Sequence, residues 1–352
     1  MIKICYIPTL NTPICLWRIE NYANELLKFQ DKCRVYVDYF YSPDDNIAWD
    51  RVCLMDTDDA KVIRERLDAA FQHFDIIVFQ KIQYAPGIEL FTNLRNKYPK
   101  TKCLIDIDDA VGDIPPSHYY IDMMKNEQSY AAYHIQKSDY VISSTKYLAD
   151  SIGQLNKNTY VLPNCINEDL WKIDPIEREE KNKRRLVYVA GGGHDEDLKI
   201  AYRAIKPLLD ELPIELFVRY GGFRPDFLEE HKNINFKSVS WHISNYPQKL
   251  YNLNADIFLA PLRDTEFNRC KSNLKWIEAA YLNVPLIASN VEPYKLTKEN
   301  GCKITLCEND KDSWYNNLKD SVFNCYKLKD ECLAKYNINK EAEKLIDFYN
   351  SI

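Results

Sequence analysis

The feature that most constrains this fold is an alternation of apolar runs with helix-like stretches. Asp75–Gln80, for example, encloses a continuous apolar run of strand length. Continuous apolar strands separated by helices are typical of a parallel sheet that is covered by helices on both faces. In the first half we expect strands at 2–8, 33–39, 75–80, 102–107, 140–143 and 159–162, and helices at 17–29, 60–71, 88–98, 121–136 and 146–155.

The same pattern restarts after a charged stretch at Asn167–Arg185, which is typical of a solvated linker. In the second half we expect strands at 186–190, 214–219, 234–239, 256–260, 285–289 and 303–306, and helices at 197–211, 247–253, 272–282, 311–323 and 340–349. The sequence therefore predicts an α/β protein with two Rossmann-like domains facing a central cleft. Residues 1–166 form the first domain, 167–185 the linker and 186–335 the second domain. A C-terminal helix at 336–352 packs back on the first domain.

Composition narrows the class of protein further. The 352 residues carry a net charge of -6, which gives no positive reason to propose a DNA or membrane partner. The 11 cysteines form no CxxC pair and no zinc-like cluster, so we expect buried, reduced thiols and a cytoplasmic protein. Met1–Pro8 is too short and too soon interrupted for a signal peptide, and no apolar run is long enough for a transmembrane segment.

A cationic loop precedes one of the expected helices of the second domain. Arg263, Arg269 and Lys271 bring positive charge to this loop, and Ser272 or Asn273 can cap the helix that follows. Free N–H groups at a helix start, together with a nearby ammonium, bind phosphate. The alternative is an ordinary amphipathic helix with surface charges.

Glu278 lies six residues after Ser272, which is about 9 Å along a helix. That distance is roughly the reach from a diphosphate to a ribose. Two alanines and a Val-Pro-Leu-Ile-Ala run follow it, so we expect a partly buried carboxylate. The segment Phe267–Glu278 thus has what a nucleoside diphosphate requires of a protein.

Glycine is scarce, at 9 residues, yet three stand together at Gly191-Gly192-Gly193, directly after an expected strand. Glycines at such a turn let the backbone approach a ligand, and His194 beside them is expected to face the cleft. Asp195 or Asp197 can cap the helix that follows. The alternative is a tight turn with a capping aspartate.

Three carboxylates follow the fourth expected strand, at Asp106, Asp108 and Asp109. They are costly to place together unless they are solvated, paired or used. Asp106 and Asp108 share one face if the strand continues, and Asp109 begins the loop. We expect a catalytic or acceptor-binding role. A surface turn and a D-x-D metal site are the alternatives.

Two further residues are candidates for acceptor binding. Arg18 opens a helix after the first strand, where it can clamp an acceptor or a phosphate, or lie at the surface. His118 follows the carboxylates in a Pro-rich loop, where a plain loop histidine is the alternative.

These residues together resemble the family 4-like glycosyltransferases of the GT-B architecture (glycosyl transferases group 1), over nearly the whole chain. The best anchors are Lys271–Ala280 with Val284–Ser289, then Gly191–Asp197, Ile105–Asp109 and Leu162–Asn164. The resemblance implies transfer of a sugar from a nucleotide-diphosphate donor to an acceptor hydroxyl, with retention and without a metal. It implies a UDP- or GDP-sugar as co-substrate and no cofactor.

The resemblance also assigns roles, with two departures. Glu278 matches the second Glu of the family's Glu-x7-Glu motif, which implies ribose recognition, while Cys270 stands in place of the first. Asp108 falls at or near the position of a catalytic-site His. We therefore expect catalytic roles for Asp108, Lys271 and Arg269, donor binding by Gly192, Gly193, His194, Arg263, Ser272 and Glu278 in the second domain, and acceptor binding by Arg18, Asp106, Asp109 and His118 in the first.

Two other functions remain open on the same fold. One is a phage-type DNA glycosyltransferase that acts on a hydroxymethylated base, against which the net charge of -6 counts. The other is a non-catalytic nucleotide- or glycan-binding module, which Cys270 and Asp108 suggest. Both glycosyltransferase functions require a nucleotide sugar as partner, and the acceptor can be a glycan, a protein or a nucleic acid.

Overall fold

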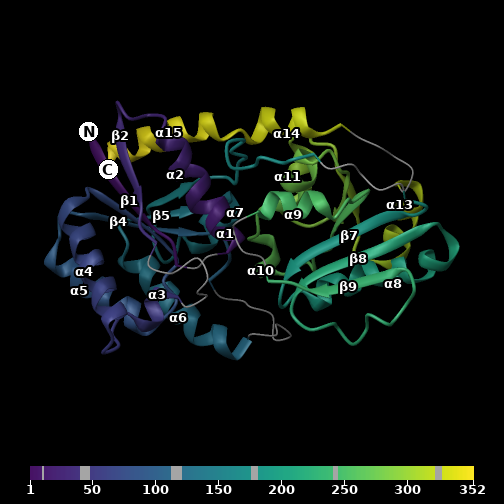
Figure 1. The fold of residues 1–352 in the computed structure, drawn as a ribbon, viewed down its shortest axis with the longest axis horizontal. Helices are drawn as coiled ribbons and strands as arrows, with labels where there is room; N and C mark the ends of the chain where they lie inside the picture. Colours follow the sequence, from purple (N-terminus) through teal and green to yellow (C-terminus); the bar gives the residue numbers. More distant parts are fainter. Residues whose placement is uncertain (10–11, 40–47, 112–120, 176–180, 241–244, 322–326) are drawn as a thin grey trace. The chain divides into compact units, whose positions relative to one another are not determined.

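The computed structural model describes residues 1–352 except 10–11, 40–47, 112–120, 176–180, 241–244 and 322–326, and it leaves the side chains of 121–127 undescribed. The chain divides into two compact units (Figure 1). Unit 1 is built from Met1–Asp113, Asp122–Leu170 and Asn337–Ile352, and unit 2 from Trp171–Tyr336.

Unit 1 contains a six-stranded parallel sheet in the order β2-β1-β3-β4-β5-β6. Aliphatic and aromatic side chains of β1, β3 and β4 are almost completely buried, which explains why their sequences read as continuous apolar runs. The strands are β1 (Ile2–Ile7), β2 (Cys33–Val37), β3 (Ile76–Gln80), β4 (Lys102–Ile107), β5 (Tyr140–Ser143) and β6 (Thr159–Val161); the helices are α1 (Pro13–Cys15), α2 (Asn21–Leu26), α3 (Trp49–Val52), α4 (Asp58–His73), α5 (Ala85–Lys97), α6 (Ile121–Lys137), α7 (Lys146–Ile152) and α15 (Ile338–Ser351).

The helix expected at 17–29 is not a continuous α-helix. A π-helical turn, η1 (Leu16–Glu20), separates α1 from α2, and α2 ends at Leu26. Four successive residues of η1, from Leu16 to Ile19, are buried, so this turn has no exposed polar face until Glu20. Turns of this kind often occur at functional sites.

The last helix, α15, packs against α2 and so belongs to unit 1. The hydroxyls of Tyr6 in β1 and Tyr349 in α15 are 2.8 Å apart in a buried hydrogen bond. Phe348 stacks on Tyr160, with ring centroids 4.2 Å apart. The first strand and the last helix are therefore joined in one core.

Unit 2 contains a second six-stranded parallel sheet in the order β12-β11-β10-β7-β8-β9. The chain leaves β9 and returns on the other side of β7 with β10, so a topological switch point lies between β7 and β10. The strands are β7 (Arg184–Gly191), β8 (Ile214–Gly221), β9 (Ile234–Ser238), β10 (Ile257–Ala260), β11 (Leu286–Ser289) and β12 (Thr305–Cys307); the helices are α8 (Asp195–Glu211), α9 (Tyr246–Asn252), α10 (Glu266–Arg269), α11 (Leu274–Tyr281), α12 (Tyr294–Glu299), α13 (Lys311–Ser321) and α14 (Lys329–Tyr336).

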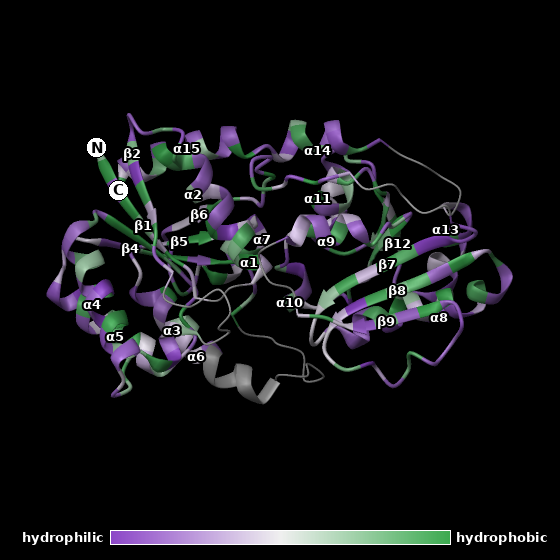
Figure 2. Cartoon of the chain, viewed as in Figure 1, coloured by the Kyte–Doolittle hydropathy of each residue, from purple (hydrophilic) through white to green (hydrophobic). Residues whose placement is uncertain are grey.

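Hydropathy follows this architecture (Figure 2): the strands of both sheets are largely hydrophobic, whereas most helices alternate polar and apolar positions. In unit 2, Ile205 of α8 and Leu318 of α13 belong to the same hydrophobic core as Leu216 of β8. Among the described residues, no helix combines the length and the apolar character that a membrane span requires. The ten cysteines that the structure describes are all buried free thiols, as expected.

The expected linker is wrong at its C-terminal end, where Arg184 and Arg185 begin β7. Both contact Asp256: Arg184 through its guanidinium at 3.2 Å, and Arg185 through its backbone N–H at 2.7 Å. Trp171, near the other end, is fully buried. Charged residues of this stretch therefore form ion pairs at the start of β7 and are not all solvated linker residues.

Candidate functional site

Asp197 joins the two loops at the switch point of unit 2. It lies in the first turn of α8, after β7, and is 1% exposed. Its Oδ1 accepts hydrogen bonds from the backbone N–H of Arg263 at 2.8 Å and from Asn268 Nδ2 at 3.1 Å, both beyond β10. Its Oδ2 lies 2.8 Å from His194 Nδ1. One buried carboxylate thus fixes the relative positions of both loops.

The glycine-rich loop after β7 approaches other backbone closely. Gly193 has φ of 88°, a conformation that favours glycine. A Cβ on Gly221, at the end of β8, would lie 3.0 Å from the nitrogen of Gly192. The N–H of His194 donates to the hydroxyl of Tyr220 at 2.9 Å, so this loop rests on the tyrosine.

The expected cap of α8 is wrong. His194 occupies the N-cap position without a side-chain capping bond, and Asp195 and Asp197 lie inside the first turn. Asp197 is instead used to hold the loops. The carboxylates of the first turn still complement the positive end of the helix dipole.

The cationic segment after β10 forms the short helix α10 and a turn into α11. Thr265 caps α10 by accepting from the N–H of Asn268. Arg269 is half-exposed and its Nε lies 2.6 Å from Asp264 Oδ1. The ammonium of Lys271 lies 4.6 Å from the centroid of the Phe267 ring.

Asn273 occupies the N-cap position of α11, but its side chain does not cap the helix. Its Nδ2 donates instead to Tyr336 Oη at 2.6 Å and to Thr297 Oγ1 at 3.0 Å. Asn273 is therefore not the side-chain cap expected there. The N–H groups of the first turn of an α-helix have no partner within the helix itself, so this end has the donors that an anion requires. Ser272 and Lys271 immediately precede it.

Glu278 is more deeply buried than expected, at 3% exposure. Its Oε1 accepts from the hydroxyl of Tyr246 at 2.5 Å, and its Oε2 pairs with Lys275 Nζ at 2.8 Å. Burial, with the negative charges of Glu278 and Asp197, raises the pKa of Tyr294. The segment 268–278 carries both Glu278 and the Asn268 amide that binds Asp197, so it links the buried carboxylate to the two loops.

Cys270 is completely buried. Its thiol cannot contact a sugar in this conformation, in contrast to the carboxylate that the resemblance would place there. Any recognition of a donor sugar by unit 2 must come from other side chains.

In unit 1, Arg18 and Asp106 form a buried pair, with side chains 1% and 2% exposed. Arg18 Nε and Nη2 each lie 2.9 Å from a carboxylate oxygen of Asp106, and Nη1 donates to the carbonyl of Leu162 and to Asn164 Oδ1 at 2.7 and 2.9 Å. The two groups bind each other, and Arg18 also binds the chain just after β6, so neither lies at the surface.

Asp108 follows β4 and is partly buried. Burial, the charge of Asp109 and the charge of Asp106 raise its pKa to about 7, against the opposing effects of Lys81 and Arg18. A carboxyl with a pKa near neutrality can exchange a proton at physiological pH. His118 lies outside the described residues.

Replacing Asp108 with asparagine should raise the melting temperature at pH 8 and leave it nearly unchanged at pH 4. Because the pKa of Asp108 is raised in the folded state, its protonated form stabilises the fold fully below the unfolded pKa near 3.8. This stabilisation is lost as the pH rises through about 7. The asparagine amide is neutral at every pH, so the variant does not lose it. Thermal unfolding at both pH values tests this, with the exposed Asp150→Asn as control. An equal shift at both pH values would contradict it.

Sequence reasoning missed several residues of the unit 2 site. The sequence indicates Asp197 only as a helix cap, and it assigns no separate role to Asn268, Tyr220 or Tyr246. Their partners lie between 5 and 71 positions away in the chain. The local signal available was the Thr265-x-x-Asn268 spacing of a cap, which indicates a short helix but no site.

No protein-family model matches this chain, and no curated protein matches it in sequence. Several solved structures match its fold. Sucrose-phosphate synthase from Thermosynechococcus elongatus has 14% identity and a TM-score of 0.69, with 100% of this chain and 99% of that chain covered. Anabaena HepE, solved in complex with UDP and glucose, has 10% identity and a TM-score of 0.65, with both chains covered completely.

A UDP-GlcNAc 2-epimerase from Methanocaldococcus jannaschii, solved in complex with UDP-GlcNAc and UDP, also matches. It has 12% identity and a TM-score of 0.53, and both chains are again covered completely. Identities this low establish the fold alone. The chain has the two-domain GT-B fold, with an α/β sheet in each unit, as the sequence predicted.

Proposed function

We propose that this chain transfers a sugar from a nucleotide-diphosphate donor, a UDP-sugar, to an acceptor hydroxyl. The observation that carries the proposal is the junction at Asp197. It fixes two loops at the switch point between β7 and β10, where ligands of parallel α/β sheets bind, beside the segment 271–278. The fold's occurrence in Anabaena HepE with UDP and glucose supports a nucleotide sugar as ligand.

In this proposal the diphosphate lies at the N-terminal end of α11. Breaking the anomeric bond leaves negative charge on the diphosphate, and Lys271 with the first-turn N–H groups stabilises that charge as it develops. We also assign Ser272, which precedes this helix in the chain, and Arg263, in the loop that Asp197 holds, to the diphosphate site. The glycines at 192 and 193 admit the donor close to the backbone.

Glu278 has the chemistry to bind the ribose. Each carboxylate oxygen accepts more than one hydrogen bond, so ribose hydroxyls can bind in addition to Tyr246 and Lys275. Lys275 and Tyr246 hold the carboxylate in one orientation. That preorganisation reduces what binding costs in side-chain entropy.

We assign acceptor binding to unit 1. Asp108, with its raised pKa, orients the acceptor hydroxyl or accepts its proton. Arg18 and Asp106 are positioning residues in this proposal. Their buried pair holds the ends of β4 and β6 together and so fixes the positions of Asp108 and Asp109.

The donor is tested by a thermal-shift screen against UDP-, GDP-, ADP- and dTDP-sugars. A ligand that binds only the folded state raises the melting temperature, so we expect the largest shift with a UDP-sugar. Absence of a shift with every nucleotide would contradict the proposal.

Lys271→Ala should lower donor turnover about a hundredfold, the usual loss when one group that stabilises developing charge is removed. The change should appear mainly in kcat, because this charge is largest in the transition state. Steady-state kinetics with the donor found in the screen measures it. Lys237→Ala, an exposed cation on β9 of the same unit, is the matched control. Equal rates for both variants would remove Lys271 from the site.

A sugar epimerase is the second candidate, because UDP-GlcNAc 2-epimerases share this fold. The two functions differ in what they require. An epimerase converts UDP-GlcNAc in the absence of any acceptor, whereas a transferase needs one or gives slow hydrolysis. Proton NMR of UDP-GlcNAc incubated with the protein alone distinguishes them: a second UDP-sugar isomer indicates epimerase activity.

A further inference from the structure

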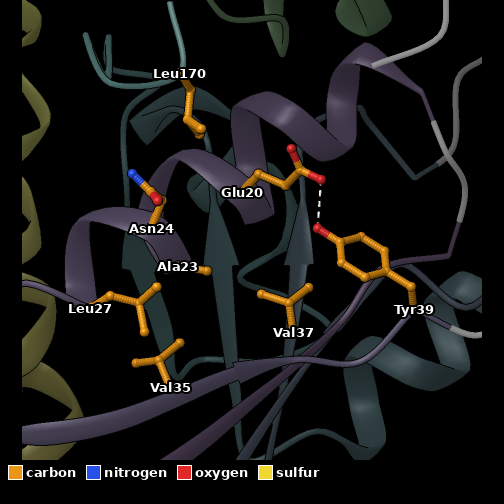
Figure 3. A pocket seen from close by; sticks show the side chains of 8 residues that line it. All are labelled: Glu20, Ala23, Asn24, Leu27, Val35, Val37, Tyr39 and Leu170. Atoms are coloured by element: carbon orange, nitrogen blue, oxygen red, sulfur yellow. Dashed lines mark hydrogen bonds between the residues drawn. The ribbon is translucent and has the colours of Figure 1, made fainter. Parts of the chain in front are cut away.

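A pocket in unit 1 lies outside both sites described above (Figure 3). It opens between α2 and β2, the edge strand of the sheet, and has a volume of about 350 Å³. Small-molecule sites have volumes of roughly 300–1,000 Å³. The space is therefore sufficient for a ligand about the size of a short alkyl chain with a head group.

The walls of this pocket are apolar because of how β2 and α2 are patterned. Side chains alternate along β2, so Val35 and Val37 face the pocket while Tyr36, 53% exposed, lies on the opposite face. The remaining apolar lining comes from Ala23, Leu27 and Leu170.

One end of the pocket is polar. Glu20, the last residue of η1, accepts a hydrogen bond from the hydroxyl of Tyr39 at 2.5 Å, and both side chains line the pocket. Asn24 lies one helical turn further on. Figure 3 shows the Glu20–Tyr39 pair at one end and Leu27 with Val35 toward the other.

The carboxylate of Glu20 has no cationic partner within the part of the chain that the structure describes; its partner there is the hydroxyl of Tyr39. Burial raises the pKa of Glu20 even though the hydrogen bond from Tyr39 lowers it. A carboxylate partly removed from water is costly unless it is paired, and a cation from outside would supply that partner.

We propose that this pocket binds a small amphipathic ammonium, with its charged nitrogen against Glu20 and its apolar chain between α2 and β2. The π-helical turn that ends at Glu20 directs the carboxylate to the polar end of the pocket while Arg18, two residues earlier, is buried in the core. None of the pocket residues is assigned to the donor site, so this proposal is tested separately from the proposed sugar transfer.

The experiment compares three probes that share an eight-carbon chain: octylammonium, octanol and octanoate. Each is titrated calorimetrically into the full chain at neutral pH, below the concentration at which it forms micelles. We expect octylammonium to bind, octanol to bind about tenfold more weakly because a charge-assisted hydrogen bond is lost, and octanoate not to bind. Equal binding of octanol and octylammonium, or no binding of octylammonium, would overturn the proposal.

Two variants locate the binding. Glu20→Gln keeps the shape and the hydrogen bond from Tyr39 but removes the charge, so octylammonium should weaken to the level of octanol. Leu27→Trp fills the pocket from its rim, where Leu27 is 48% exposed and a larger side chain does not disturb the core. It should abolish binding of both probes. Tyr36→Ser, on the opposite face of β2, is the control and should change neither. Binding that survives unchanged in Glu20→Gln would assign the probe to another surface and overturn the proposal.

Discussion

Replacing Asp106 with alanine should destabilise unit 1 by about 3–5 kcal/mol, the usual effect of removing one partner of a buried ion pair. Arg18, 1% exposed, would keep its charge without a carboxylate. Its remaining acceptors are the carbonyl of Leu162 and Asn164 Oδ1, both neutral. The loss is thus the cost of leaving a guanidinium buried and unpaired.

Equilibrium unfolding in urea measures this change. Asp150→Ala is the matched control, because Asp150 pairs with Lys146 on an exposed surface of α7 and such pairs contribute less than about 1 kcal/mol. Arg18→Met combined with Asp106→Leu should recover part of the loss, since no charge is then left buried. A loss in Asp106→Ala no larger than that of the control would show that the pair is solvated.

Replacing Asp197 with alanine should have an effect of similar size on unit 2. Asp197 accepts from the backbone N–H and the guanidinium of Arg263, from Asn268 and from His194, and the substitution leaves these groups without their acceptor. We expect a loss of about 3–5 kcal/mol in unfolding free energy, with nucleotide-sugar binding lost as well because the two loops separate.

Glu196→Ala is the control for this substitution. Glu196 lies in the same helical turn, but its side chain is 41% exposed and pairs with Lys199 at the surface, so we expect a change below about 0.5 kcal/mol. Denaturant titration and the thermal-shift assay read out stability and binding separately. A stable Asp197→Ala protein that still binds the donor would show that the loops hold their positions without this carboxylate.

The contribution of Asp197 should also depend on pH. Burial raises its pKa, but hydrogen bonds from His194 and from the Arg263 N–H lower it further, so the folded-state value lies below 3.8. A depressed carboxyl pKa contributes stability that is complete above the unfolded pKa and is lost as the pH falls through the folded value. The difference in unfolding free energy between the original protein and Asp197→Asn should therefore shrink below about pH 4.

The sheets were predictable because strands that are buried on both faces leave a continuous apolar signal. The bounds of β4 and β5 agree residue for residue with the expectation. The short helices α3, α10, α12 and α14 were missed. With four residues each, α3 and α10 make about one turn, which is too short for a periodic pattern. The π turn at Leu16–Glu20 was also missed, because its residues are as compatible with an ordinary helix.

Part of the candidate site can be proposed from the sequence. The segment 271–278 and the glycine loop are candidates because a helix start, a cation and clustered glycines are visible in sequence. What could not be found is how they are joined. Asp197, Asn268 and Arg263 meet only because β7 and β10 are neighbours, and that adjacency depends on the strand order. The roles expected for the individual residues stay predictions until the variants above are measured.

The hydrogen bond between Tyr6 and Tyr349 has a consequence for how the chain is made. During translation, β1 emerges from the ribosome long before α15, yet the two share one core. Unit 2, most of which is contiguous in sequence, can fold while the nascent chain is still growing. Unit 1 lacks part of its core until residues 337–352 are synthesised. A released chain that ends at residue 336 should therefore contain a protease-resistant unit 2 beside a unit 1 that is more readily cleaved.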